Sequence, residues 1–469
     1  MRSSRLVVTT CEYATCLSFK WVDAAGNSVV SLDYDEVVRR GVRALGKVGG
    51  RLLVENAVVE AASGGLVEVS DVTQCLGSCF FRCGLVTGSL ESRDGDVGVD
   101  GDLRAGGLVD VREGRLMVGG TLTAERVKVR KSLEIKGGLD AGDVSVGGSL
   151  QVEGPSKAGR IDVGGSVECA SGLDADLVDV GGSVRVSGAT RSSRIDVGGK
   201  FVGDGVVADD VDVGGSFEAG EVDVGKIDVG GTIRLGGGVV RREADVGGRL
   251  ESSKPLRFGR LDAGGKIWLS GGEGGEIRAG GRLTNSGALK FSAIQVGGTV
   301  ELDGDASGQA VEVGGTLRVH GGLKLSGGLR VGGKADVSGG LEAGHVRVGG
   351  SVRADSINAR TEIQSNSIYT IKGARAARIE IGRRGEARGP LVAEEVVIGD
   401  DAEVDDIYGG VVTLRRGSRV GNVYAVDLRV ENNVEFRERV MYSDHLRLDR
   451  RVSFFAPPEK AEKLPQPPL

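Results

Sequence analysis

Aromatic residues and proline are scarce in this chain of 469 residues. Phe, Trp and Tyr together make up 4% of the sequence, and five of the eight prolines stand in the last thirteen residues. So few aromatic residues argue against a core built from large rings. Abundant glycine with so little proline argues against collagen and against plain disorder.

Long apolar runs and a strong charge imbalance are also missing. The chain carries 60 basic and 66 acidic residues, a net charge of −6, which gives no electrostatic case for a nucleic-acid partner. No apolar run reaches the roughly 18 residues that a membrane helix needs. The first ten residues lack the apolar segment of a signal peptide. We therefore expect a soluble protein in the cytoplasm that binds no nucleic acid.

Glycine is abundant, with 82 residues, and much of it stands in a repeated unit, V-G-G or A-G-G. The first glycines of these units are Gly147, Gly164, Gly181, Gly198, Gly214, Gly230, Gly247, Gly264, Gly280, Gly297, Gly314, Gly332 and Gly349. Neighbouring units are 16 to 18 residues apart, and the same interval continues to the C-terminus where the glycines fade. Between about residues 100 and 130 the spacing slips, which predicts an irregular coil or an insertion. A fixed period near 17 residues is typical of a solenoid.

Within each repeat, apolar and polar residues alternate. Ile195-Asp196-Val197 is one example, and it predicts a short strand with one face inside. The Gly-Gly pair that follows predicts a sharp bend, because glycine accepts a positive φ. The sequence thus predicts an all-β fold, a long single-stranded right-handed β-helix over residues 48–455. Its narrow interior would be filled by Val, Ile, Leu and Ala, with no room for large aromatic rings.

Residues 1–47 do not follow the repeat and predict a small α+β cap over the first coil. Residues 6–10, 16–21 and 29–32 are typical of strands, and residues 24–27 of a turn. Asp33 followed by Glu36 resembles a capping box. The apolar residues after it, Val37, Val38, Val42 and Leu45, then predict one face of a short helix.

Several repeats, such as "IDVGGSVE" and "VDVGGSVRV", and the stretch from Ile379 to Phe455 resemble bactofilins. The resemblance implies a right-handed β-helix of about 17 residues per coil and a cytoskeletal, polymer-forming scaffold that associates end to end. It also implies a partner that is associated with the membrane or envelope. This chain departs from the family in its length, about four times the usual β-helix, and in its N-terminal module.

The C-terminal end of the predicted β-helix is a candidate surface for self-association. Phe436, Val452, Phe454 and Phe455 come together in the last coil, and only a polar, Pro-rich tail follows at 456–469, which we expect to be disordered. Because residues 1–47 would cover the other end, tail-to-tail dimers are expected. The alternative is that the rings only plug the end.

Three of the six cysteines, Cys75, Cys79 and Cys83, have the spacing C-x3-C-x3-C. Thiolates bind zinc or iron–sulfur clusters, but this is not the usual C-x2-C spacing. Free thiols, disulfides and a metal site all stay open for these residues, and no cofactor is predicted.

A row of acidic residues precedes the V-G-G or A-G-G units: Asp162, Asp179, Asp196, Asp212, Asp228, Asp245 and Asp262. Stacked carboxylates are able to hold calcium. Basic residues stand two positions earlier in about every second coil, at Arg160, Arg194, Lys226 and Arg260, and they favour a solvated salt-bridge face instead.

No catalytic constellation stands out. The three histidines, His320, His345 and His445, are scattered, and the repeat brings no Ser/His/Asp set together. The short bends leave little room for the long loops of a β-helical carbohydrate-active enzyme. The sequence therefore predicts a structural protein without enzymatic activity. The alternative is a monomeric β-helical rod that acts as an adhesion or interaction surface.

Overall fold

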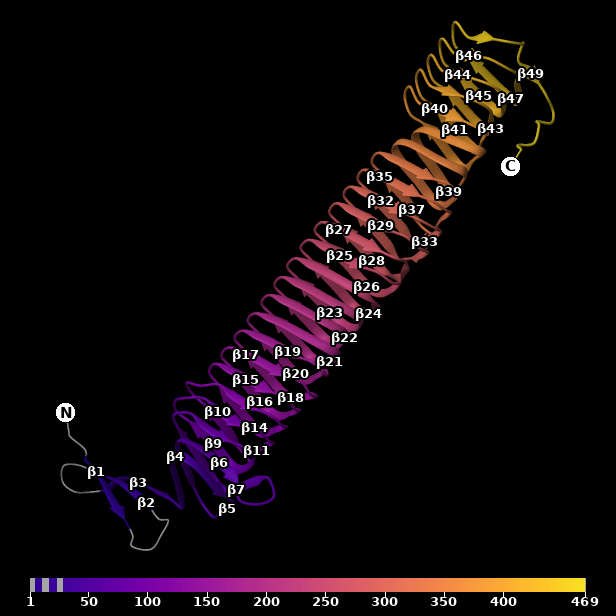
Figure 1. The fold of residues 1–469 in the computed structure, drawn as a ribbon. Coiled ribbons are helices and arrows are strands. Elements are labelled where there is room, and N and C mark those ends of the chain that lie inside the picture. The colour runs from indigo at the N-terminus through magenta and orange to yellow at the C-terminus, as the bar shows by residue number, and fades with distance from the viewer. Residues whose placement is uncertain (1–4, 11–16, 23–27, 469) are drawn as a thin grey trace. The chain divides into compact units, whose positions relative to one another are not determined.

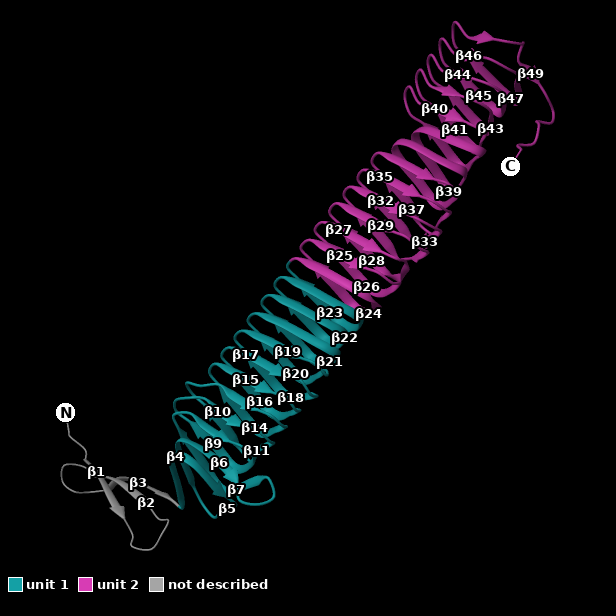
Figure 2. Cartoon of the chain, in the orientation of Figure 1, with its two compact units in different colours: residues 1–230 teal, residues 231–469 magenta. Residues whose placement is uncertain are grey.

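The computed structural model describes the backbone of residues 5–10, 17–22 and 28–468, and side chains from residue 35 onward. All regular structure in these residues is β-strand (Figure 1). None of the described residues forms a helix that could cross a membrane. The chain divides into two compact units, residues 1–230 and 231–469, which are coloured separately in Figure 2.

The first unit begins with a three-stranded antiparallel sheet of β1 (Arg5–Thr10), β2 (Leu17–Val22) and β3 (Ser28–Tyr34). These strands confirm the predicted ones, and the predicted turn at 24–27 lies outside the described residues. Whether the N-terminal module covers an end of the solenoid stays a prediction.

The rest of the first unit is a parallel β-solenoid. Its strands are β4 (Glu36–Leu45), β5 (Lys47–Val48), β6 (Leu52–Ala61), β7 (Leu66–Leu76), β8 (Cys79–Phe81), β9 (Gly84–Ser92), β10 (Val97–Val99), β11 (Leu103–Ala105), β12 (Leu108–Val111), β13 (Leu116–Val118), β14 (Leu122–Val129), β15 (Ser132–Ile135), β16 (Leu139–Val146), β17 (Ser149–Val152), β18 (Ser156–Val163), β19 (Ser166–Cys169), β20 (Leu173–Val180), β21 (Ser183–Val197), β22 (Lys200–Val213) and β23 (Ser216–Val229).

The second unit is a parallel β-solenoid as well. Its strands are β24 (Thr232–Val246), β25 (Arg249–Ser252), β26 (Leu256–Ala263), β27 (Lys266–Leu269), β28 (Gly272–Ala279), β29 (Arg282–Asn285), β30 (Leu289–Lys290), β31 (Ala293–Val296), β32 (Thr299–Leu302), β33 (Ala306–Gly308), β34 (Ala310–Val313), β35 (Thr316–Val319), β36 (Leu323–Leu325), β37 (Gly328–Val331), β38 (Lys334–Val337), β39 (Gly340–Ile381), β40 (Glu386–Arg388), β41 (Leu391–Ile398), β42 (Glu403–Val404), β43 (Ile407–Leu414), β44 (Arg419–Val420), β45 (Val423–Val430), β46 (Glu435–Phe436), β47 (Val440–Leu448), β48 (Ser453–Phe454) and β49 (Glu459–Lys460).

The predicted period and alternation are confirmed, with about 17 residues per coil. Val163 pairs with Val180 and Val180 with Val197 in the next coil, and all three are at most 1% exposed. Where the spacing slips, the coils are longer, since Val99 pairs with Val118. Each inward residue therefore lies over the equivalent one in the coil before it, and these stacked columns make the core. The handedness stays a prediction.

The predicted helix after Asp33 is wrong. Asp33 ends up in β3, and the residues after it form β4, which pairs in parallel with β6 from Glu36 to Leu45. Val38 and Leu45 are buried, whereas Val42 is 59% exposed, so the expected apolar stripe does not form. Strand pairing at nine positions of β4 outweighs a weak local helix signal. The parallel ladder therefore starts at Glu36, ahead of the predicted boundary at Val48.

The ladder also continues past Phe455, the predicted end of the β-helix. In the expected disordered tail, β49 pairs with β47, and the Ala461 amide donates a 2.9 Å hydrogen bond to the Tyr442 carbonyl. The physical reason is that the outer edge of β47 offers unpaired backbone groups, and the following segment takes part of that edge.

Large aromatic rings do fit inside, contrary to the prediction. Phe81, Phe201, Phe217 and Phe436 are among the largest fully buried side chains. Phe201 stacks on Phe217 with ring centroids 5.2 Å apart. Glycine makes the space, because a Cβ on Gly203 would lie only 2.9 Å from the Phe201 ring.

The V-G-G glycines are required for a reason other than the predicted positive φ. Among the described residues, positive φ is confined to other positions. A Cβ on Gly181 would lie 2.6 Å from the carbonyl oxygen of Gly164, and a Cβ on Gly199 would lie 2.6 Å from that of Gly182. At this corner the coils stack so closely that a side chain would collide with the backbone of the coil before it.

Candidate functional site

In the last coil of the second unit, two inward positions are more exposed than the same positions one coil earlier. Leu428 is 0% exposed, and its partner Leu446 in the last coil is only partly buried. Val430 is 4% exposed, and its partner Leu448 is 43% exposed. These two core columns therefore lose burial at the C-terminal end, although Val440 at the start of β47 is still only 2% exposed, and part of the apolar cross-section is left open.

The four aromatic and aliphatic residues predicted at this end take different positions. Phe436 is 2% exposed, because the Phe454 ring covers it with a centroid distance of 4.9 Å and an interplanar angle of 4°. Val452 is partly buried in the last coil. Phe455 points away from the core and is 79% exposed. Phe454 thus acts as the plug, and Phe455 adds to the outer surface.

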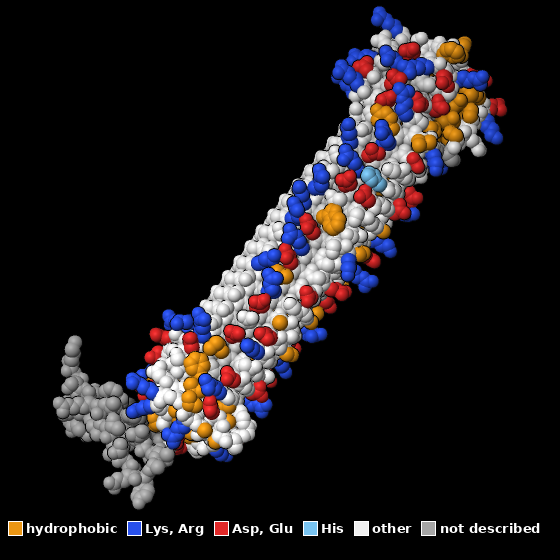
Figure 3. Space-filling model, viewed as in Figure 1, with side chains coloured by type: hydrophobic (Ala, Val, Ile, Leu, Met, Phe, Trp, Pro, Cys, Tyr) orange, Lys and Arg blue, Asp and Glu red, His pale blue; other side chains and the backbone are white. Residues whose placement is uncertain are grey.

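Sequence reasoning missed three residues of the open end, Tyr442, Leu446 and Leu448. They occupy the inward positions of β47, in register with Ala425, Leu428 and Val430 of β45. The signal that would have found them is the apolar alternation itself, extended by one coil to the last repeat. Figure 3 shows hydrophobic side chains gathered on the visible face of the C-terminal coils.

The backbone edge of the last coil is also only partly used. β48 pairs with β46, and β49 pairs with a short stretch of β47 at Met441 and Tyr442. Beyond Tyr442, the outer edge of β47 meets no further described strand. An apolar cross-section with an unpaired strand edge is the kind of surface through which β-proteins add another chain.

Ion pairs join the coils that come shortly before the last one in the chain. Arg388 contacts Glu403 and Asp405, both at 3.2 Å, and Arg437 contacts Glu403 at 2.8 Å. A hydrogen bond from the Tyr369 hydroxyl, 2.8 Å long, lowers the pKa of Glu386 together with Arg388. Arg437 lowers the pKa of Glu403.

Acidification is therefore expected to weaken these coils. A carboxylate whose pKa is lowered in the folded state stabilises the fold above its unfolded pKa of about 4.3, and the contribution is lost as pH falls through the lower folded value. When the pH is lowered from about 5 to about 3, we expect the urea midpoint of wild type to decrease more than the urea midpoint of Glu403→Gln. Each exposed pair contributes under about 1 kcal/mol. Glu125→Gln, an exposed residue outside the network, serves as the control and should follow wild type; equal slopes for all three proteins would contradict the prediction.

The three spaced cysteines lie in the core of the first unit. Cys75, Cys79 and Cys83 are buried free thiols, as is Cys169, whereas Cys11 and Cys16 lie outside the described residues. The Cys79 thiol donates a 3.2 Å hydrogen bond to the Val54 carbonyl. The hydrogen bond between Cys75 and Cys79, with burial, raises the pKa of Cys75, and the same bond lowers the pKa of Cys79. The cysteines therefore pack as core residues here and do not gather with other ligands into a metal cluster among the described residues.

The acidic row is stacked as predicted. In the first unit, Asp162, Asp179, Asp196, Asp212 and Asp228 pair directly from coil to coil. Arg160 lies 3.5 Å from Asp162 and 3.9 Å from Asp179, and so offsets their repulsion. Arg260 departs from the prediction, because it pairs with Glu276 at 2.7 Å and with Glu243 instead of Asp262. Rows of both charges are visible in Figure 3.

A groove of about 930 Å³ follows the glycine corner of the second unit. The V-G-G glycines form its floor, because they carry no side chains there. Its flank carries side chains of mixed charge, with Arg278, Gln295, Glu312, Arg330 and Arg347 in successive coils. The mixed charge points to no single class of ligand.

The histidines do not meet one another. His320 pairs with Asp303 at 2.8 Å, and His345 lies elsewhere in β39. His445 lies beside Asp427 and Asp444 on the last two coils, the one group of three described residues whose ligand atoms are close enough for a metal ion. No protein-family model matches the chain, and neither a curated protein nor a solved structure matches it.

Proposed function

We propose that this protein is a structural repeat protein that associates with a second copy of itself through the open C-terminal coil. The observation that carries the proposal is the loss of burial along the core columns, from Val430 at 4% to Leu448 at 43% exposure. A β-solenoid is a repeat architecture. Two copies that associate through their last coils would need the least rearrangement of the coils themselves. The resemblance to bactofilins supports a cytoskeletal scaffold in the cytoplasm, with an envelope-associated partner.

A like-to-like contact has a specific geometry. Two identical ends that meet form an isologous interface, in which each residue of the surface appears twice around a two-fold axis. Tyr442, Leu446 and Leu448 of one copy would then lie against the same residues of the other. Phe455 would lie at the rim, because it points away from the core.

The test is analytical ultracentrifugation of wild type and of Leu448→Glu across a concentration series. Burial of one such side chain contributes roughly 1.5–3 kcal/mol, and the interface contains it twice, so the dissociation constant should rise by about a hundredfold or more. Phe455→Ser should weaken the dimer less. Phe454→Ser is unsuitable, because it also removes the stack on Phe436.

Trp268→Ser is the matched control, because Trp268 is 41% exposed on β27, far along the chain from the last coil. It should leave the dimer intact. Dimers that persist in Leu448→Glu would overturn the C-terminal contact. A wild type that stays monomeric at high concentration would favour the solitary interaction surface, and long polymers would mean that the other end associates as well.

A further inference from the structure

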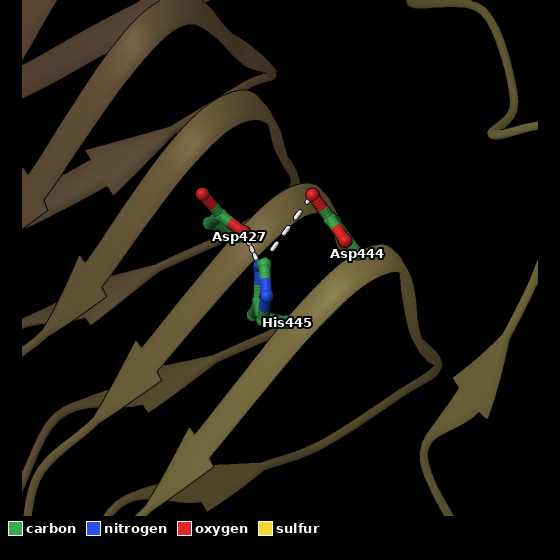
Figure 4. A group of neighbouring side chains, drawn as sticks. All are labelled: Asp427, Asp444 and His445. Carbon is green, nitrogen blue, oxygen red and sulfur yellow. Dashed lines mark hydrogen bonds and ion pairs between the residues drawn. The ribbon is translucent and has the colours of Figure 1, made fainter.

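The last two coils bring three potential metal ligands together on the outer surface. Figure 4 shows Asp427 of β45 beside Asp444 and His445 of β47. The Nδ1 atom of His445 lies 2.9 Å from Oδ1 of Asp427 and 3.5 Å from Oδ2 of Asp444. One ligand atom from each residue lies within 4.8 Å of the other two.

A β-bulge creates this arrangement. Ala425 pairs with Tyr442, but Asp427 pairs with His445, so β47 contains one more residue than β45 over this stretch. In a regular strand, Asp444 and His445 would point to opposite faces. The extra residue breaks the alternation and allows both side chains to reach the side on which Asp427 lies, as bulges at functional sites often do.

The cluster belongs to the last coil and is not part of the repeat. In the earlier coils, the positions in register with Asp427 are Val411, Glu395 and Arg378, in that order going back along the chain. Arg378 and Glu395 form an ordinary ion pair at 2.6 Å. Nothing in the solenoid period demands two carboxylates and an imidazole at this place.

The chemistry of the three groups matches a borderline divalent cation. Two carboxylates and a neutral imidazole give a net charge of −2. Zinc binds imidazole nitrogen and carboxylate oxygen at about 2.0–2.2 Å, which places tetrahedral ligands about 3.3 Å apart. The separations of 2.9 and 3.5 Å from His445 lie on either side of this value, and all three ligand atoms lie within 4.8 Å of one another, so rotations of these side chains would bring them to ligand distance. Calcium and magnesium prefer sites made of oxygen alone.

We propose that Asp427, Asp444 and His445 bind a divalent transition-metal ion, best matched by zinc, which clamps the last coil to the coil before it. The His445 side chain is 68% exposed, which leaves the fourth position to water. The ion joins β45 to β47 across the bulge, where the backbone ladder is interrupted. This inference does not depend on self-association, since all three ligands come from one chain.

The test is titration of metal-free full-length protein with Zn²⁺ by calorimetry, and with Co²⁺ by visible absorption. Wild type should bind one ion through this site. His445→Ala and Asp444→Asn should each weaken that binding by at least about tenfold. The matched control is His320→Ala, because His320 pairs with Asp303 and, among the described residues, has no second carboxylate within reach for a metal ion. It should bind like wild type.

Two further measurements separate this site from the cysteines and from a general effect on folding. Co²⁺ bound at this site should show no thiolate charge-transfer band, which cysteine ligands would produce. Hydrogen exchange of residues 440–448 should slow when Zn²⁺ is added to wild type and stay unchanged in His445→Ala. Absence of binding, a thiolate band as the only signal, or equal binding by His445→Ala would each overturn the proposal.

Discussion

Replacing Val197 by Asp is expected to lower the free energy of unfolding by several kcal/mol. The Val197 side chain is 0% exposed and lies between Val180 and Val213 in the same core column. A carboxylate there has no partner, so it must either stay charged in an apolar interior or take up a proton at a cost. Because every coil rests on the one before it, the damage should spread to the neighbouring coils.

The neighbouring variant, Asp196→Asn, is the control for this experiment. The Asp196 side chain is 46% exposed and lies 3.7 Å from Arg194, so its loss should cost under about 1 kcal/mol. Urea denaturation followed by circular dichroism measures both variants. Equal midpoints for the two would show that the inward and outward faces of the coil are assigned the wrong way round.

The sequence was sufficient to predict this register because the same alternation of apolar and polar residues recurs in the repeats. An apolar residue before Gly-Gly recurs at Val163, Val180 and Val197, and each must face the core if one of them does. A one-residue slip would turn the whole column outward. Periodicity therefore determined the fold class and the buried face of most coils.

The sequence was least informative where structure depends on non-local pairing. The segment from Glu36 to Leu45 has an apolar pattern that suits one face of a helix, yet it forms β4 because β6 offers a parallel partner along its whole length. The interior rings illustrate the same limit. Phe201 fits because Gly203 leaves space beside it, and composition alone does not reveal such compensation.

Only part of the candidate site could be predicted for a related reason. The cluster of Phe residues directed attention to the C-terminal coil, but Phe436 and Phe454 lie one over the other, so only the outer one is near the surface. Which residues a last coil exposes depends on where the pairing stops. The juxtaposition of Asp427 with His445 depends on a bulge, and a one-residue insertion near a strand end leaves no periodic signal.

Replacing Gly181 by Ala is expected to destabilise the protein by about 1–3 kcal/mol, the usual cost of forcing an extra methyl group into a packed site. The new Cβ would lie 2.6 Å from the Gly164 carbonyl oxygen, and a backbone atom in a stacked ladder is unable to move aside. Gly181 is exposed to solvent, but this does not relieve the clash, because the new Cβ would point along the stacking direction toward the preceding coil. Ordinarily an exposed Gly→Ala change would instead stabilise by restricting the unfolded chain.

Gly107→Ala provides the control, since Ala105-Gly106-Gly107 has the same A-G-G residues at a different bend of the coil, one with more room. A Cβ on Gly107 would lie 3.6 Å from the Gly88 carbonyl oxygen, an ordinary contact distance. That variant should be neutral or slightly stabilising, as measured by thermal unfolding beside Gly181→Ala. If both variants behaved alike, close stacking of the coils would not explain the glycines. The recurrence of V-G-G would then have to come from bend conformation, which the φ angles at these corners do not support.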